Sequence, residues 1–218
     1  MYYEQLNQIF QSLANPVEAQ GMSAYMKNLF SFYGIKSPIR KEASKEILSQ
    51  LKKEKEIQWD FVHKCWENPH RELQYVALEY LKSIKKRLTP QDIPALKNLA
   101  LQKSWWDSID VFDRVIGDIV LRNPEIENLM IEWSLDENFW LRRIAIDHQL
   151  LRKSDTNTSL LKTIILNNLG QKEFFINKAI GWSLRDYSKT NPDWVRNFVE
   201  KYKNELSNLS IREATKYL

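Results

Sequence analysis

The sequence predicts an all-α protein that forms an α-solenoid. Nearly every segment places apolar residues three and four positions apart, which is the spacing of one face of an α-helix. No segment sustains the alternation of apolar and polar residues that marks a β-strand, and the 218 residues include only 5 Gly and 7 Pro. A helical face recurs every 33–35 residues in the later part of the chain, which is typical of an α-solenoid.

Helix boundaries in the first half of the chain follow from proline and capping residues. Asn15-Pro16 ends the first helix, and the segment from Tyr33 to Ser37 forms a turn before Pro38 starts the third helix, with Ser37 as its cap. Thr89-Pro90 is a further start signal. We therefore expect helices at residues 3–13, 17–30, 38–51, 57–66, 69–84 and 90–101.

The repeat becomes visible when Leu73, Ser108, Leu141 and Ile176 are set in register, at offsets of 35, 33 and 35 residues. Positions three, four and eight residues further on are apolar in almost every copy, so this face is predicted to be buried. Positions two and six residues further on form the opposite face. They hold Tyr75, Glu79, Asp110, Arg114, Arg143, Asp147, Lys178 and Trp182.

Stacked helices would place that opposite face on one continuous surface, where Trp106, Asp110, Arg143, Trp182 and Arg185 are expected to converge. Trp106 and Asp110 lie four residues apart, and therefore on one side of a helix. An aromatic plane beside a carboxylate is suited to bind a flat, positively charged group. The alternative is structural: both adjacent tryptophans belong to the core, and the carboxylate that follows them is an ordinary charge of a helix N-terminus.

Composition limits the class of protein. A formal charge of +4 permits nucleic-acid binding without requiring it. The single cysteine, Cys65, excludes an internal disulfide, and the three histidines show no metal-site spacing. No apolar run approaches the roughly 20 residues of a membrane span, and the first residues do not resemble a signal peptide. We therefore expect a cytoplasmic protein that has no metal ion and does not bind membranes.

Four segments carry a resemblance to a known family. They are residues 33–40 (YGIKSPIR), 104–110 (SWWDSID), 139–143 (FWLRR) and 174–187 (FFINKAIGWSLRDY). In this order and at this spacing they resemble the AlkD-type DNA alkylation repair enzymes, which are DNA glycosylases built from HEAT-like repeats. The resemblance extends from about Tyr25 to about Trp194.

The resemblance implies a single domain over residues 1–218, a C-shaped solenoid with a basic concave groove that binds double-stranded DNA as a monomer. It implies hydrolysis of the N-glycosidic bond of N3- and N7-alkylated purines in base excision repair, without base flipping. The roles it implies are a catalytic carboxylate at Asp110, aromatic contacts to the damaged nucleotide at Trp106 and Trp182, a tyrosine near the lesion at Tyr25, and DNA-backbone contacts at Arg143 and Arg185.

Further backbone contacts are expected from Lys36, Arg40 and Lys41, which lie at the turn and at the start of the helix that follows it. The chemistry needs no metal and no other cofactor. An alkylated purine already carries positive charge and leaves as a neutral base, so the general acid of most glycosidases is dispensable and one carboxylate suffices.

Two other functions remain open from the sequence. One is a non-catalytic solenoid that binds damaged or structured nucleic acid. The other is a protein–protein scaffold, which is a common use of α-solenoids. A scaffold would show no particular affinity for duplex DNA, whereas phosphate binding would weaken steeply with salt.

Overall fold

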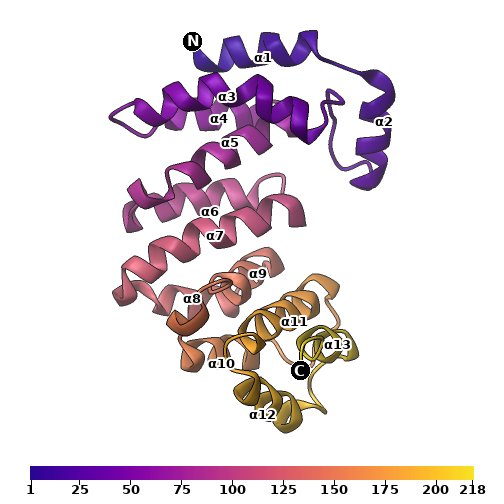
Figure 1. The fold of residues 1–218 in the computed structure, drawn as a ribbon, viewed down its shortest axis with the longest axis vertical. Coiled ribbons are helices and arrows are strands. Elements are labelled where there is room, and N and C mark those ends of the chain that lie inside the picture. Colours follow the sequence, from indigo (N-terminus) through magenta and orange to yellow (C-terminus); the bar gives the residue numbers. More distant parts are fainter. The chain divides into compact units, whose positions relative to one another are not determined.

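The computed structural model describes residues 1–218 and consists of thirteen α-helices and four short 3₁₀ helices (Figure 1). It contains no β-strand beyond one isolated bridge between Ser31 and His70. The all-α prediction is therefore confirmed, and the repeated helices are consistent with an α-solenoid. The chain divides into two compact units, residues 1–84 and residues 85–218.

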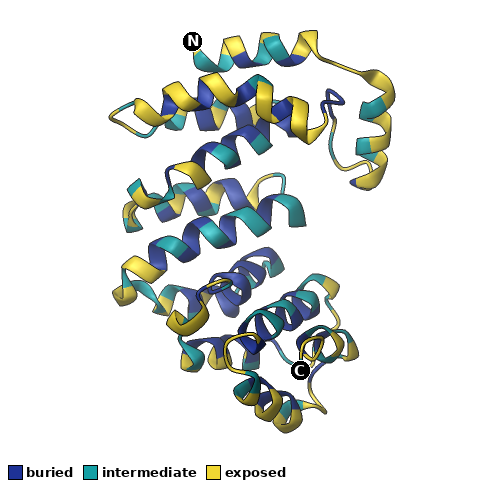
Figure 2. Ribbon diagram, in the orientation of Figure 1, coloured by how far each residue is buried: buried dark blue, intermediate teal, exposed yellow.

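The N-terminal unit contains α1 (Tyr2–Ser12), α2 (Pro16–Tyr25), α3 (Ser37–Lys53), α4 (Trp59–Glu67) and α5 (Arg71–Ser83). Helix α1 packs on α3 and α4, and α5 packs on the same two helices. Helix α2 differs from the others because none of its residues is buried, and Figure 2 shows its ribbon without a buried face.

Several predicted helix boundaries in this unit are wrong, and α4 and α5 each begin two residues later than expected, at Trp59 and Arg71. Helix α2 ends at Tyr25 instead of extending to residue 30, because Lys27 and Asn28 adopt the left-handed conformation, with φ of 58° and 57°. Helix α3 begins at Ser37 itself, and Lys36 occupies the cap position without a side-chain hydrogen bond.

The turn before α3 is built around a buried carboxylate. Backbone N–H groups of Tyr33, Gly34 and Ile35 donate to the two oxygens of Glu72, at 3.0, 2.9 and 3.0 Å. Gly34 has φ of +87°, and a Cβ atom there would lie 2.1 Å from the carbonyl oxygen of Asn15. The turn therefore requires glycine at this position.

The C-terminal unit opens with η1 (Lys85–Arg87) and η2 (Pro90–Asp92). Its α-helices are α6 (Ile93–Leu101), α7 (Trp106–Arg122), α8 (Asn128–Ser134), α9 (Phe139–Asp147), α10 (Thr158–Leu166), α11 (Phe174–Ser188), α12 (Pro192–Tyr202) and α13 (Asn208–Ala214), with η3 (Pro124–Ile126) and η4 (Lys153–Asp155) between them. Helix α9 contacts both α7 and α11, so these three form one row, and α13 packs on α11. The helix predicted at residues 90–101 begins as the 3₁₀ turn η2 and continues as α6.

The buried face that the register predicts is confirmed. Leu73, Ser108, Leu141 and Ile176 are at most 1% exposed. Among the apolar residues that lie three, four and eight positions after each of them, only Val111 is not buried. No helix combines the length and the apolar composition required to span a lipid bilayer.

Candidate active site

Asp110 and Arg143 form an ion pair between α7 and α9. Nε and Nη2 of Arg143 donate to Oδ1 of Asp110 at 2.9 and 2.8 Å, and Nη1 donates to the carbonyl oxygen of Phe175 on α11 at 2.7 Å. The Arg143 side chain is 2% exposed and that of Asp110 is 21% exposed. The carboxylate thus reaches solvent, while the guanidinium that fixes it lies inside the protein.

Two further carboxylates lie behind this pair. Asp110, Asp113 and Asp147 each place a carboxylate oxygen within 4.8 Å of the other two. Nη2 of Arg143 lies 3.8 Å from Oδ2 of Asp147, and Nε of Arg114 lies 3.1 Å from Oδ1 of Asp113. Three carboxylates at this spacing could hold a metal ion. In this structure the positive charge between Asp110 and Asp147 comes from the Arg143 guanidinium.

Burial changes the protonation of this cluster. It raises the pKa of Asp147 to about 7 and raises the pKa of Asp113 well above its ordinary value. Burial also raises the pKa of Asp110, and the Arg143 guanidinium opposes this effect. Three carboxylates face only two guanidinium groups, and burial favours the protonated forms of Asp113 and Asp147.

Trp182 is the aromatic centre of the site and is surrounded by cations. The Cζ atoms of Arg143 and Arg185 lie 5.4 and 5.8 Å from its ring centroid, and Nζ of Lys178 lies 5.6 Å away. Lys178 and Arg185 both also form ion pairs with Glu213 of α13. The structure therefore brings Asp110, Arg143, Trp182 and Arg185 together, as the sequence predicts.

The two adjacent tryptophans occupy different places. Trp105 is the N-cap of α7, and its ring packs edge-on against Trp140 and Phe175 with centroids 5.9 and 5.3 Å apart. Trp106 is the first residue of α7, is partly exposed, and lies one helical turn before Asp110. Trp105 therefore has a packing role, and Trp106 stays a candidate for ligand contact.

Predicted DNA contacts of the N-terminal unit lie at the start of α3. Nζ of Lys36 is 2.8 Å from Glu18, and Nη2 of Arg40 is 3.1 Å from Glu79. Arg40 is buried, whereas Lys41 is exposed and forms no ion pair. These three cations therefore differ in how readily they can reach a phosphate.

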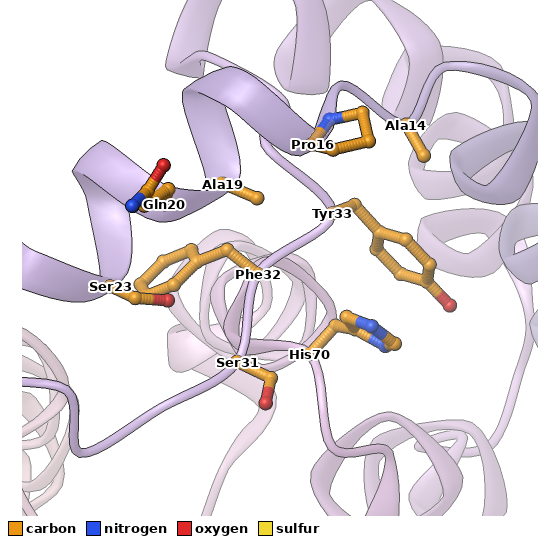
Figure 3. A pocket seen from close by; sticks show the side chains of 9 residues that line it. All are labelled: Ala14, Pro16, Ala19, Gln20, Ser23, Ser31, Phe32, Tyr33 and His70. Atoms are coloured by element: carbon orange, nitrogen blue, oxygen red, sulfur yellow. The ribbon is translucent and has the colours of Figure 1, made fainter.

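Tyr25, the remaining predicted contact, is 71% exposed at the end of α2. An open hollow of about 490 Å³ lies beside this helix (Figure 3). Tyr33 and His70 stack at its edge with ring centroids 3.8 Å apart. Its lining is Ala14, Pro16, Ala19, Gln20, Ser23, Ser31, Phe32, Tyr33 and His70. No predicted site residue contributes to the hollow.

Comparison with known proteins decides the family. Residues 6–218 match the profile of the family described as DNA alkylation repair enzyme. The chain belongs to this family. A solved structure described as a predicted DNA alkylation repair enzyme from Enterococcus faecalis is 40% identical and matches with a TM-score of 0.86, over 94% of this chain and 96% of that one.

A second structure, smu.31 from Streptococcus mutans, is 15% identical, with a TM-score of 0.62 over 84% of this chain and 96% of that one. At this identity it supports the fold alone. No curated protein matches the chain. As a member of the DNA alkylation repair enzyme family, the protein has a role in DNA repair, with alkylated DNA as the class of substrate.

The repair enzyme departs from the sequence-based expectation at α9. The positions two and six residues after each register residue were expected to form one open surface, but Arg143 and Asp147 are 1% and 0% exposed. Helices α7 and α11 pack against α9, and so do α6, α8 and α10, which together bury it. In this structure Arg143 therefore binds Asp110 and does not present its guanidinium to solvent.

Sequence reasoning also missed Glu213 and the role of Asp113. Glu213 lies on α13, beyond the last register position considered, but one further offset of 35 residues from Ile176 reaches Ile211 and places Glu213 two residues on, so the repeat offered a signal. Asp113 follows Asp110 by three residues, which places both on one side of α7. That spacing was the available signal for a carboxylate cluster.

Proposed function

We propose that this DNA alkylation repair enzyme is a glycosylase that hydrolyses the N-glycosidic bond of N3- and N7-alkylated purines in duplex DNA. The observation that carries the proposal is the Asp110–Arg143 pair. One partly exposed carboxylate is held by two hydrogen bonds from a buried guanidinium, beside Trp182. A carboxylate fixed in this way is preorganised to stabilise positive charge that develops in front of it.

The reaction requires little else from the protein. The bond between the sugar C1′ and the alkylated base breaks, and its electron pair leaves with the base, which becomes neutral. Positive charge passes to the sugar, where Asp110 stabilises it. A water molecule adds to C1′, and its proton passes to Asp110 or to solvent. No separate acid is needed for the leaving group.

The aromatic side chains contribute to recognition of the cationic base. Stacking of a cation on a tryptophan ring is worth about 0.5–2 kcal/mol. Trp182 already interacts with three protein cations. We propose that Trp106, which lies one turn before Asp110 on α7, contributes to this attraction together with Trp182.

In this proposal Arg143 positions Asp110, and DNA-backbone contacts come from Arg185, Lys36, Arg40 and Lys41, with Tyr25 near the lesion. The family match over residues 6–218 supports treating both units as one DNA-binding domain. We further propose that the enzyme acts as a monomer, in the cytoplasm and in base excision repair.

Base release from duplex DNA that contains N7-methylguanine tests the activity. Asp110→Asn keeps the shape of the side chain and removes its charge, so we expect release to fall by about 100-fold or more. Asp107→Asn is the matched control, because it makes the same charge change in the first turn of the same helix. Binding to undamaged duplex DNA should be nearly unchanged in both variants.

The outcomes separate the alternatives. Normal release by Asp110→Asn would refute the assigned carboxylate. Release by the wild type at the spontaneous rate, together with salt-sensitive binding, would favour the non-catalytic DNA binder. A protein that binds no duplex DNA at any salt concentration would favour the protein–protein scaffold.

A further inference from the structure

The carboxylate of Glu213 binds two cations of the candidate site at once. Lys178 and Arg185 lie seven residues apart on α11, with Trp182 between them. Nζ of Lys178 contacts Oε1 of Glu213 at 2.6 Å, and Nη1 of Arg185 contacts Oε2. Each carboxylate oxygen thus binds one cation, beside the ring that forms the aromatic centre of the site.

The packing of α13 on α11 holds this carboxylate in place. The two helices lie side by side (Figure 1) and meet at Gly181, where an added Cβ atom would lie 2.5 Å from Cβ of Glu213. Oγ of Ser210, one turn earlier on α13, donates to the carbonyl oxygen of Asn177 at 2.7 Å. The Glu213 side chain is only 13% exposed. It is therefore a built part of the site and not a mobile surface charge.

We propose that Glu213 is an internal substitute for a DNA phosphate. In the free protein its carboxylate binds Lys178 and Arg185, and this carboxylate must be displaced when the DNA backbone binds. A carboxylate and a phosphodiester each carry one negative charge shared over two oxygens, so both can bridge the same two cations. Lys178 and Arg185 remain about a quarter exposed, so a phosphate can approach them from solvent.

This competition lowers the affinity for undamaged DNA. Binding at this position exchanges two existing ion pairs for two new ones, so the gain in free energy is smaller than for two free cations. The inference rests on the proposed function, because it takes duplex DNA as the ligand of this surface. It adds that the C-terminal helix sets how strongly the enzyme holds DNA that contains no lesion.

The test is Glu213→Gln, which keeps the side chain nearly isosteric and removes its charge. The matched control is Glu200→Gln on α12, which removes one exposed charge and leaves the site intact. Affinity for an undamaged duplex is measured by fluorescence anisotropy over a series of salt concentrations. We expect Glu213→Gln to bind about threefold to tenfold more tightly than the control near about 100 mM salt, with a steeper dependence on salt.

Binding by Glu213→Gln that equals or falls below that of the control would overturn the inference. A decrease would show instead that Glu213 positions Lys178 and Arg185 for DNA. If Glu213→Gln does not fold, Glu213→Asp is used, because its shorter side chain cannot reach both cations, and tighter binding than the control is again required.

Failure of the two proposals can be told apart by measuring base release in the same preparations. Wild-type release with unaltered binding by Glu213→Gln refutes only the inference. Tighter binding by this variant with no wild-type release refutes only the glycosylase. Absence of duplex binding by the wild type and by Glu213→Gln refutes both.

Discussion

Asp110 and Arg143 form one ion pair in which Asp110 is partly exposed and Arg143 is buried. The family resemblance implied that Asp110 is the catalytic carboxylate, and the structure leaves it partly exposed. Arg143 was predicted to contact the DNA backbone, but its guanidinium donates to Asp110 and to the Phe175 carbonyl oxygen. Sequence spacing shows that two residues share a helix face, and it does not show which of them a neighbouring helix covers.

The buried Asp113–Asp147 pair predicts how stability depends on pH. Burial raises the pKa of Asp147 to about 7, whereas an aspartate in the unfolded chain titrates near 3.9. The folded protein therefore binds more protons than the unfolded chain between these values. The stabilising contribution of protonated Asp147 to the free energy of unfolding is fully present below about pH 3.9 and is lost as the pH rises through about 7.

We expect Asp147→Asn to flatten this dependence, because the variant cannot lose that proton. The slope attributable to Asp147 in the wild type is at most about 1.4 kcal/mol per pH unit. The measurement is the free energy of unfolding by denaturant at several pH values between 4 and 7. Asp193→Asn, an exposed side chain on α12, is the control. Equal slopes in the two variants would show that Asp147 is ionised throughout.

At the scale of the elements, the sequence predicted helix identity well and helix ends less well. Apolar spacing identified the buried face of each repeat, since burial of that face is what makes the helix stable. The end of α2 was missed, because Lys27 and Asn28 adopt φ near +58° without glycine. Extending the repeat register by 35 residues to Ile211 places Glu213 at the position equivalent to Lys178, but the close approach of α13 to α11 at Gly181 depends on tertiary packing.

Gly34 gives a prediction about the turn between α2 and α3. A Cβ atom there would lie 2.1 Å from the Asn15 carbonyl oxygen, and the backbone has φ of +87°. Gly34→Ala should therefore destabilise the protein by about 1–3 kcal/mol, measured as the free energy of unfolding. Gly21→Ala in α2 is the matched control, because nothing lies within 4 Å of its added Cβ atom.

The control should be neutral or slightly stabilising, because alanine favours a helix over glycine by about 1 kcal/mol. Similar free energies of unfolding for the two alanine variants would contradict the assigned strain. The turn also carries the N–H groups that bind Glu72, so its loss is expected to disturb the packing of the turn against α5.

At the scale of the whole molecule, most of the proposed DNA-binding cations already have acidic partners. Lys36 pairs with Glu18, Arg40 with Glu79 and Arg185 with Glu213. The formal charge of only +4 agrees with this balance of charges. Cations of this kind contribute less to non-specific affinity than unpaired ones, so much of the attraction to undamaged DNA should come from exposed lysines.

Lys41 is the exposed lysine on which this argument can be tested. It forms no ion pair, so a phosphate that it neutralises releases counterions without breaking a contact in the protein. We expect Lys41→Ala to weaken binding to damaged and undamaged duplexes alike, and to reduce the slope of log K against log salt by about 0.9. Lys203→Ala at the C-cap of α12, which removes a lysine paired with Glu200, is the control and should leave the slope unchanged. An unaltered slope in Lys41→Ala would show that Lys41, at the start of α3, does not contact DNA. The affinity for DNA would then have to come from cations that exchange an acidic partner for a phosphate.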